Sequence, residues 1–374
     1  MFFPKFRTEE CLLEIRDCLE NGWTGSGFKT LEFETKWKTY TGEHFALFLN
    51  SATSALQLAV ESAKRVFNWS EGDEVISTPL TFVSTNHVIL QAGLVPIFAD
   101  VDESLNLDPA SILERLSKKT KAIMFVGIGG NPSNLLKISE ICQQHGLILI
   151  LDAAHMSGTR IEGKFASEYA DITCYSFQAV KNLPTGDSGM ITTSDANIYK
   201  VAKSLSWLGI DKETYARVNS EGYSWKYDVK DVGYKHNGNS IMAALGIISL
   251  KYLEQDNAWR RALAETYKRE LSDTKGIEFV SEEENVTSSQ HLFQIKINRR
   301  DEVIESLRMS GISTGVHYVT NTAYPMYQHM KKQTPNASRL SDRVLSLPLF
   351  IDLTNKEAIE IAGKLRNVLG KIPK

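Results

Sequence analysis

Short apolar runs alternate with stretches of helical period over the first half of the chain. This alternation is typical of βαβ units and a mostly parallel sheet. The predicted strands are 46–49, 74–77, 95–99, 122–126, 147–151, 172–176 and 189–192. The predicted helices between them lie near 53–66, 82–92, 109–117 and 134–145. Seven strands suit one large α/β layer, and functional groups in such a layer lie beyond the carboxyl ends of the strands.

An amphipathic helix, 8–21, and a second helix, 30–40, are predicted before the first strand. The sequence Trp23-Thr24-Gly25 lies in the flexible turn between them, where glycine lets the backbone come close to a ligand. The alternative is that this turn only connects the two helices and contacts no ligand.

The alternation of predicted strands and helices ends after residue 192. A helical region follows, and then a polar, aromatic-rich stretch, 223–239, which we expect to be a mobile or interface loop. A long helix is predicted over 240–272. The remaining pattern predicts a βαβ-like section, with strands 290–297 and 313–317 and helices 301–309 and 355–369. We therefore expect a large domain over residues 1–245 and a smaller C-terminal α/β domain over 246–374.

Composition narrows the class of protein. The 374 residues can bury two cores, and the apolar and charged fractions, 42% and 23%, are those of an ordinary globular protein. A net charge of −3 gives no electrostatic case for nucleic acid or an anionic membrane. With no signal-like or membrane-spanning apolar run, a cytoplasmic location is expected. The four cysteines lack a CxxC pair and the eight histidines lack metal-ligand spacing, so free thiols and no metal site are expected.

Three groups of residues could take part in binding or catalysis. The first is NSATSAL, residues 50–56, which follows a strand and opens a helix. Free N–H groups and the helix dipole make such a helix start suitable for a phosphate, although most such sequences are simple helix caps.

The second group is Asp152 with His155 after an apolar strand. A carboxylate there needs a cationic partner, such as a protonated pyridine nitrogen, or it merely caps a helix.

The third group centres on Lys181, in SFQAVKNLPTGDSG. A partly desolvated lysine has a lowered pKa, and its neutral amine can add to an aldehyde to form an imine. Most lysines are solvated surface groups, and the combination with Asp152 and Ser176 is what favours a functional one. Together they have the layout of a pyridoxal phosphate pocket. The sequence has no G-x-G-x-x-G after a strand, no P-loop lysine, no G-x-S-x-G and no HExxH, so dehydrogenase, NTPase, serine hydrolase and zinc enzyme lack support.

The sequence resembles the DegT/DnrJ/EryC1/StrS family of sugar aminotransferases, within fold type I of the pyridoxal phosphate enzymes. The resemblance covers nearly the whole chain. It rests, in the family's order, on NGWTGSG, NSATSALQLAV, GDEVISTPLTFVSTNHVILQAGLVPIFADVD, LILILDAAHMSG, SFQAVKNLPTGDSGMITT, VGYKHNGNSIMAALG, GISTGVHY and LSLPLF. It implies an α/β fold with a seven-stranded, mostly parallel sheet and a smaller C-terminal domain.

The resemblance also implies roles for single residues. Lys181 would bind the cofactor as an imine and move the substrate proton, while Asp152 would pair with the pyridinium nitrogen. The other implied cofactor contacts are Ala52, Thr53 and Ser176 at the phosphate, Phe82 on the ring, His155 near the hydroxyl, and Asn237 at a neighbouring subunit's phosphate. The implied sugar contacts are Trp23, Thr24, Gly25, His317 and Tyr318; strand-end packing is the alternative for the last two. A homodimer with shared active sites follows.

The implied reaction is transfer of an amino group from L-glutamate to a nucleotide-linked keto sugar, for amino sugars of cell-surface polysaccharides such as O-antigen. A 4-keto deoxy sugar on UDP or dTDP is the expected acceptor. A 3-keto sugar, a cyclitol ketone or a non-enzymatic regulatory homologue are the alternatives.

The chain departs from the family at TGDSG, where TGEGG is usual, at Gly238 and Asn239, and at VGIGGNPSNL, which lacks a common histidine. Lys181 excludes the related dehydratases, which carry histidine there.

Overall fold

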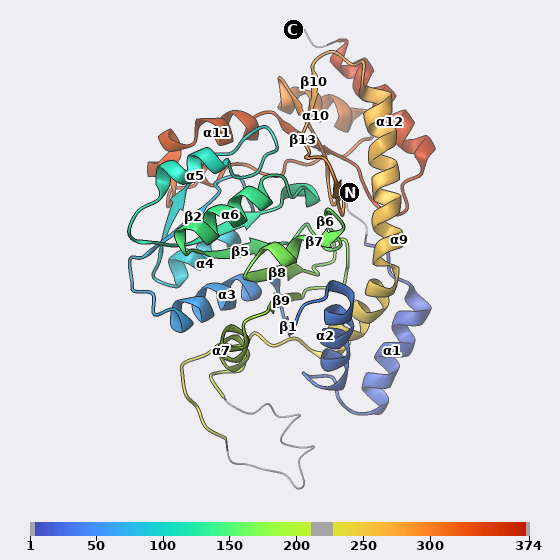
Figure 1. Ribbon diagram of the computed structural model, residues 1–374. Coiled ribbons are helices and arrows are strands. Elements are labelled where there is room, and N and C mark those ends of the chain that lie inside the picture. Colours follow the sequence, from blue (N-terminus) through green and yellow to red (C-terminus); the bar gives the residue numbers. More distant parts are fainter. Residues whose placement is uncertain (1–3, 211–226, 372–374) are drawn as a thin grey trace.

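The computed structural model describes residues 4–210 and 227–371 (Figure 1). Its centre is a seven-stranded sheet in the order β1-β9-β8-β5-β4-β2-β3. The strands are β1 (Phe45–Leu49), β2 (Glu74–Ser77), β3 (Val95–Phe98), β4 (Thr120–Val126), β5 (Ile148–Asp152), β8 (Ile172–Ser176) and β9 (Gly189–Thr193). These are the seven strands that the apolar runs predict, so the predicted sheet is confirmed.

Strand direction brings several chain segments to one edge of this sheet. Strands β8, β5, β4, β2 and β3 are parallel, whereas β9 is antiparallel to both β8 and β1. The carboxyl ends of β1, β5 and β8 therefore meet the amino end of β9. Asp152, Ser176 and Gly189 lie at this edge, together with the helix that starts after β1.

Helices cover both faces of the sheet (Figure 1). One face packs against α3 (Ala52–Val66), α4 (Ser84–Gln91) and α7 (Ala196–Ser206). The other packs against α2 (Phe28–Thr41), α5 (Pro109–Arg115), α6 (Leu135–His145) and the first part of α9 (Ser240–Leu271). Because side chains alternate along a strand, Met124 of β4 faces the first layer and Phe125 the second. Both faces are thus buried, as expected of a largely parallel sheet.

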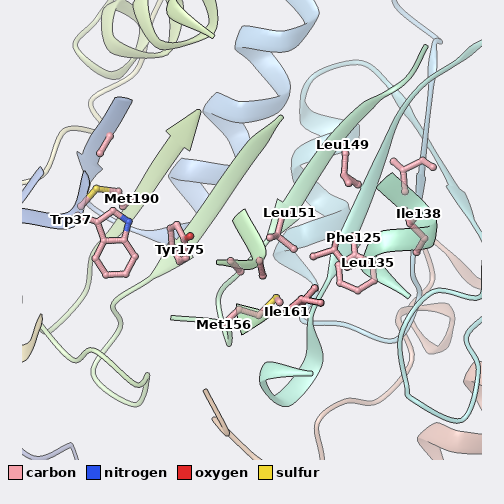
Figure 2. Close-up of a cluster of buried hydrophobic side chains, with 14 of the residues drawn as sticks. Trp37, Phe125, Leu135, Ile138, Leu149, Leu151, Met156, Ile161, Tyr175 and Met190 are labelled. Atoms are coloured by element: carbon pink, nitrogen blue, oxygen red, sulfur yellow. The ribbon is translucent and has the colours of Figure 1, made fainter. Parts of the chain in front are cut away.

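Aromatic packing fixes the strands that border Lys181. Figure 2 shows Trp37 of α2 beside Tyr175 of β8 and Met190 of β9. The rings of Trp37 and Tyr175 meet edge to face with centroids 4.8 Å apart, and Phe177 lies 5.1 Å from Trp37. Such pairs add about 0.5–1.5 kcal/mol beyond area burial. These pairs anchor the β8 end of the segment between β8 and β9, and Met190 packs in the same cluster at the β9 end.

The C-terminal part has its own core. Helix α9 continues from the large sheet to a three-stranded sheet in the order β10-β12-β13. That sheet and its helices comprise β10 (Ile277–Phe279), β12 (Phe293–Ile297), β13 (Val344–Leu347), α10 (Arg300–Met309) and α12 (Asn355–Leu369). The other elements of the described residues are α1 (Thr8–Glu20), α11 (Pro335–Ser341), β6 (Arg160–Ile161), β7 (Lys164–Phe165), β11 (Val286–Thr287) and four short 3₁₀ turns. The domain division at 245/246 falls inside α9 and stays a prediction.

Two sequence predictions for this half were wrong. The small sheet is antiparallel, not βαβ-like, and residues 313–317 form no strand. Within this segment Gly315 alone makes an isolated bridge, to Ser346, and the His317 carbonyl accepts its hydrogen bond from the Gln294 side chain rather than from a strand backbone. Part of the predicted loop 223–239 lies outside the described residues; 227–239 is irregular. No helix in the described part of the chain is long and apolar enough to cross a membrane.

Candidate active site

A cavity of about 570 Å³ opens at the carboxyl edge of the large sheet. It brings together nine residues singled out by the sequence: Ala52, Thr53, Phe82, Asp152, His155, Ser176, Lys181, His317 and Tyr318. They come from five separate stretches of the chain, in both the large sheet and the C-terminal part. The predicted site is therefore one place in the structure.

The start of α3 forms one wall of the cavity. Ser51 caps this helix, since its hydroxyl accepts a hydrogen bond from the Ser54 N–H at 3.1 Å. The cap does not use the N–H groups of Ala52 and Thr53 in the first turn, and free N–H groups at a helix start favour an anion. Gly189 of β9 packs directly on this turn, and a Cβ there would lie 2.6 Å from the Ala52 nitrogen and Ser51 carbonyl. Only glycine permits this close approach.

Asp152, 5% exposed, is the last residue of β5. Its Oδ2 accepts a hydrogen bond from the Thr85 hydroxyl at 2.8 Å, and its Oδ1 accepts one from the Ala154 N–H at 3.1 Å. Burial raises the pKa of the carboxyl, while these bonds and the charge of Lys181 act in the opposite direction. A buried carboxylate with few donors requires a cation in the cavity.

Lys181 lies in the lysine loop, residues 177–188, between β8 and β9. The Lys181 N–H donates to the Gln178 carbonyl and the Ala179 N–H to the Gly186 carbonyl, both at 2.8 Å, which closes the loop as a tight turn. The Lys181 side chain is half-buried at the cavity. Burial lowers its pKa from 10.5 to about 8, and the charge of Asp152 opposes this shift. Its amine is therefore far more often neutral near pH 8 than that of a surface lysine.

Hydrogen bonds fix the protonation of His155. The Gly129 N–H donates to Nδ1 at 3.2 Å, so Nδ1 carries no proton. Burial lowers the pKa of His155 well below 6.5, and the neutral ring therefore holds its proton on Nε2, 3.1 Å from the Tyr318 hydroxyl. His155 thus presents an N–H donor toward the cavity side occupied by Tyr318.

Phe82 and the pair His317-Tyr318 form the mouth of the cavity. Phe82 is 57% exposed, which is unusual for such a side chain, and its ring centroid lies 6.1 Å from that of Tyr318. Burial, followed by the charge of Lys181, lowers the pKa of His317 to about 4, and His317 Nδ1 lies 2.9 Å from the Ser346 hydroxyl. An exposed aromatic face beside neutral polar groups suits a flat heterocycle.

Four predicted contacts do not line the cavity of this chain: Trp23, Thr24, Gly25 and Asn237. The carbonyls of Thr24 and Gly25 accept hydrogen bonds from the Ser240 N–H at 3.1 and 2.9 Å, and the Trp23 indole donates to the Ser26 carbonyl at 2.7 Å. Asn237 pairs with Leu49 in an isolated bridge. Their predicted roles stay predictions.

Sequence reasoning missed one residue of the cavity wall, His291, and one residue that supports the wall, Thr85. Thr85 bonds Asp152 across 67 residues of sequence, and His291 lines the cavity with its ring centroid 4.3 Å from that of His155. A hydroxyl one helical turn after Phe82, on the helix that follows β2, was the available signal for Thr85. No local pattern distinguishes His291 from a core histidine.

The donor set fits pyridoxal phosphate. The start of α3 offers anion-binding N–H groups, Lys181 an amine, Asp152 a carboxylate and Phe82 a ring face. The glycine-only contact at Gly189 keeps the anion-binding turn beside the lysine loop. When bound, this cofactor supplies an electron sink for the carbon attached to the transferred nitrogen. No group of His, Cys, Asp or Glu side chains in the described residues could hold a metal ion.

Fold and site define a pyridoxal phosphate enzyme of fold type I. The model of the DegT/DnrJ/EryC1/StrS aminotransferase family matches residues 6–366, and the chain belongs to that family as a pyridoxal phosphate-dependent aminotransferase. The resemblance, the fold class and the cofactor expected from the sequence are confirmed.

Three relatives illustrate the similarity. SpsC of Bacillus subtilis, a spore coat polysaccharide biosynthesis protein, is 33% identical over 96% of this chain and 95% of its own. The PMP-form of Spr1654 from Streptococcus pneumoniae superposes with a TM-score of 0.91 at 27% identity, covering 99% of each chain. PseC of Helicobacter pylori, an aminotransferase involved in the biosynthesis of pseudoaminic acid, gives 0.91 at 25% identity over 100% of this chain and 99% of its own. The family is thus one of sugar aminotransferases.

Proposed function

We propose that this aminotransferase moves the amino group of L-glutamate to a nucleotide-linked keto sugar, most simply the 4-keto form of a deoxy sugar on UDP or dTDP. The product would be an amino sugar for cell-surface polysaccharide, such as O-antigen. The observation that carries the proposal is the amine of Lys181, its pKa lowered to about 8, in one cavity with the buried carboxylate of Asp152. The relatives SpsC and PseC support the sugar product.

Each wall of the cavity has a separate task in this reaction. Once the amino donor has replaced it, the Lys181 amine would take the proton from the carbon that bears the transferred nitrogen and return it to the carbon on the other side of that nitrogen. Asp152 would hold a cationic ring nitrogen. The Nε2–H of His155 would donate to an oxygen on the ring, and the first turn of α3 would bind the phosphate. Two half-reactions through one site predict ping-pong kinetics.

The sugar would lie at the mouth of the cavity, near His317 and Tyr318. The Trp23–Gly25 turn is bonded to Ser240, which follows Asn237 by three residues, so the turn and Asn237 belong to one local unit. We propose that this unit serves the active site of a second copy, with Asn237 at the partner's phosphate and the turn at the partner's sugar. A homodimer with shared sites follows. The expected cytoplasmic location and the domain division stay predictions.

The two half-reactions can be tested separately. The protein loaded with pyridoxal phosphate is mixed with L-glutamate, and loss of the visible cofactor band reports the first half. UDP- and dTDP-linked 4-keto deoxy sugars are then added singly, and recovery of the band with formation of an amino sugar reports the second. A 3-keto nucleotide sugar and a cyclitol ketone serve as competing acceptors. Recovery with either of these alone would overturn the proposed acceptor, and no bleaching by glutamate would overturn the donor.

A further inference from the structure

His291 lies in the active-site cavity but has no task in the reaction described so far. It precedes β12, in the C-terminal part of the chain, and is 3% exposed. Its ring centroid lies 4.3 Å from that of His155, at an interplanar angle of 33°. A second imidazole beside the first raises the question of which ring nitrogen carries its proton.

Two backbone carbonyls fix the answer through a chain of amides. Asn257 Nδ2 donates to the Ser157 carbonyl at 2.8 Å, so its Oδ1 is the atom that accepts from Asn182 Nδ2 at 2.7 Å. Asn182 Nδ2 also donates to the Ser289 carbonyl at 2.8 Å. Asn182 Oδ1 is thus left as an acceptor, and His291 Nδ1, 2.8 Å away, must be the donor.

The two stacked histidines therefore have opposite tautomers. His155 carries its proton on Nε2, since Gly129 donates to its Nδ1. His291 carries its proton on Nδ1 and has a lone pair on Nε2, for which no described residue provides a hydrogen bond. Burial lowers the pKa of His291 well below 6.5, as do the charged or titratable groups facing it: His155, Lys181, Arg260 and His317. The ring is neutral over the working pH range.

We propose that His291 is a positioning residue for Lys181, whose ammonium donates a hydrogen bond to the unprotonated Nε2 of His291 whenever the lysine is not bonded to the cofactor. The inference rests on the role proposed above for Lys181. The proton itself stays on the lysine, because the pKa of Lys181, about 8, lies above that of His291. The contact would hold the released amine near the reacting carbon.

The tautomer can be tested on the cofactor-free protein, with neither donor nor sugar present. Imidazole ¹⁵N shifts are recorded from pH 6 to 9 and His291 is assigned with His291→Gln. The expected result is a neutral ring with Nδ1 protonated throughout. A proton on Nε2, or titration near the ordinary histidine pKa of about 6.5, would overturn the proposal. Because no substrate is involved, this outcome is independent of the proposed donor and acceptor.

A pair of substitutions separates positioning from structural support. His291→Asn places an amide where Nδ1 was and keeps a partner for Asn182, whereas His291→Gln places its amide oxygen near the Nε2 position. The readout is the pKa of Lys181 in the cofactor-free protein, from the pH dependence of its acylation measured by peptide mass spectrometry. Loss of the acceptor in His291→Asn should lower this pKa by about one unit, and His291→Gln should stay near wild type. An unchanged pKa in the Asn variant, or a larger shift in the Gln variant, would contradict the proposal.

Discussion

At the residue scale, Asp152 is the group with the largest expected electrostatic effect. Among the described residues that line the cavity, Asp152 has the one buried carboxylate. Asp152→Asn removes its charge and keeps the shape of the side chain. Loss of one preorganised charge of this kind should slow the glutamate half-reaction by about 10²–10³-fold. The matched control is Thr85→Val, which removes the 2.8 Å hydrogen bond to Asp152 but keeps the charge and should cost about tenfold. Single-turnover bleaching of the cofactor band measures both, and equal losses in the two variants would refute the assignment.

The lowered pKa of Lys181 predicts how cofactor capture depends on pH. Only the neutral amine adds to an aldehyde, and with a pKa of about 8 its neutral fraction at pH 7 is about one tenth. The rate at which cofactor-free protein captures pyridoxal phosphate should rise about tenfold from pH 7 to 9, with a midpoint near 8. Stopped-flow absorbance measures it, with Lys181→Ala as the control. A midpoint near that of an exposed lysine would mean that the amine is not desolvated.

The residues that sequence reasoning found share one property. Asp152, Ser176 and Lys181 lie at the carboxyl end of a predicted strand or within five residues of it, and the carboxyl edge of a sheet is where such groups gather. Thr85 and His291 escaped because their meaning depends on partners far along the chain. Thr85 needs Asp152, and His291 needs Asn182, 109 residues away. A single histidine in a sequence does not show whether it will be buried or which cavity it will face.

At the scale of elements, the junction between β9 and α3 can be tested by adding one methyl group. Gly189→Ala would place a Cβ 2.6 Å from the backbone of Ser51 and Ala52, pushing the first turn of α3 away from the lysine loop. We expect a loss of about 1–3 kcal/mol in stability and at least about tenfold weaker binding of pyridoxal phosphate.

Gly246→Ala is the matched control for this substitution. Its Cβ would lie 2.7 Å from the Phe33 ring, a similar clash that is remote from the cavity. It should change the melting temperature but leave the affinity for pyridoxal phosphate unchanged. Fluorescence titration with the cofactor, beside thermal unfolding, measures the two effects. Equal affinity in Gly189→Ala and wild type would show that the phosphate binds elsewhere.

The same scale shows where sequence patterns succeed and fail. The strands of the large sheet were predictable because both faces are buried and each strand reads as a continuous apolar run. Residues 313–317 were predicted as a strand, yet Gly315 alone bridges Ser346 and the His317 carbonyl accepts a hydrogen bond from the Gln294 side chain. Strands β6, β7 and β11 have two residues each, too few for any period to show. The antiparallel small sheet depends on β13, which the sequence pattern did not reveal.

At the scale of the whole molecule, the proposed shared sites make a prediction about mixtures. Lys181→Ala and Asn237→Ala should each be impaired as homodimers. If Asn237 serves the partner's cavity, a heterodimer of the two variants has one site with both residues intact. Random reassociation should restore about a quarter of the wild-type activity. Activity no greater than the sum of the separate variants would place Asn237 in its own chain's site, or outside any.

The central claim is that Lys181 carries the cofactor. The protein loaded with pyridoxal phosphate is reduced with borohydride, digested and mapped by mass spectrometry, with Lys181→Ala treated in parallel. The account predicts the reduced cofactor on the peptide that contains Lys181, and no labelled peptide from the variant. A label on another lysine of the wild-type protein, or an undiminished label in Lys181→Ala, would contradict it.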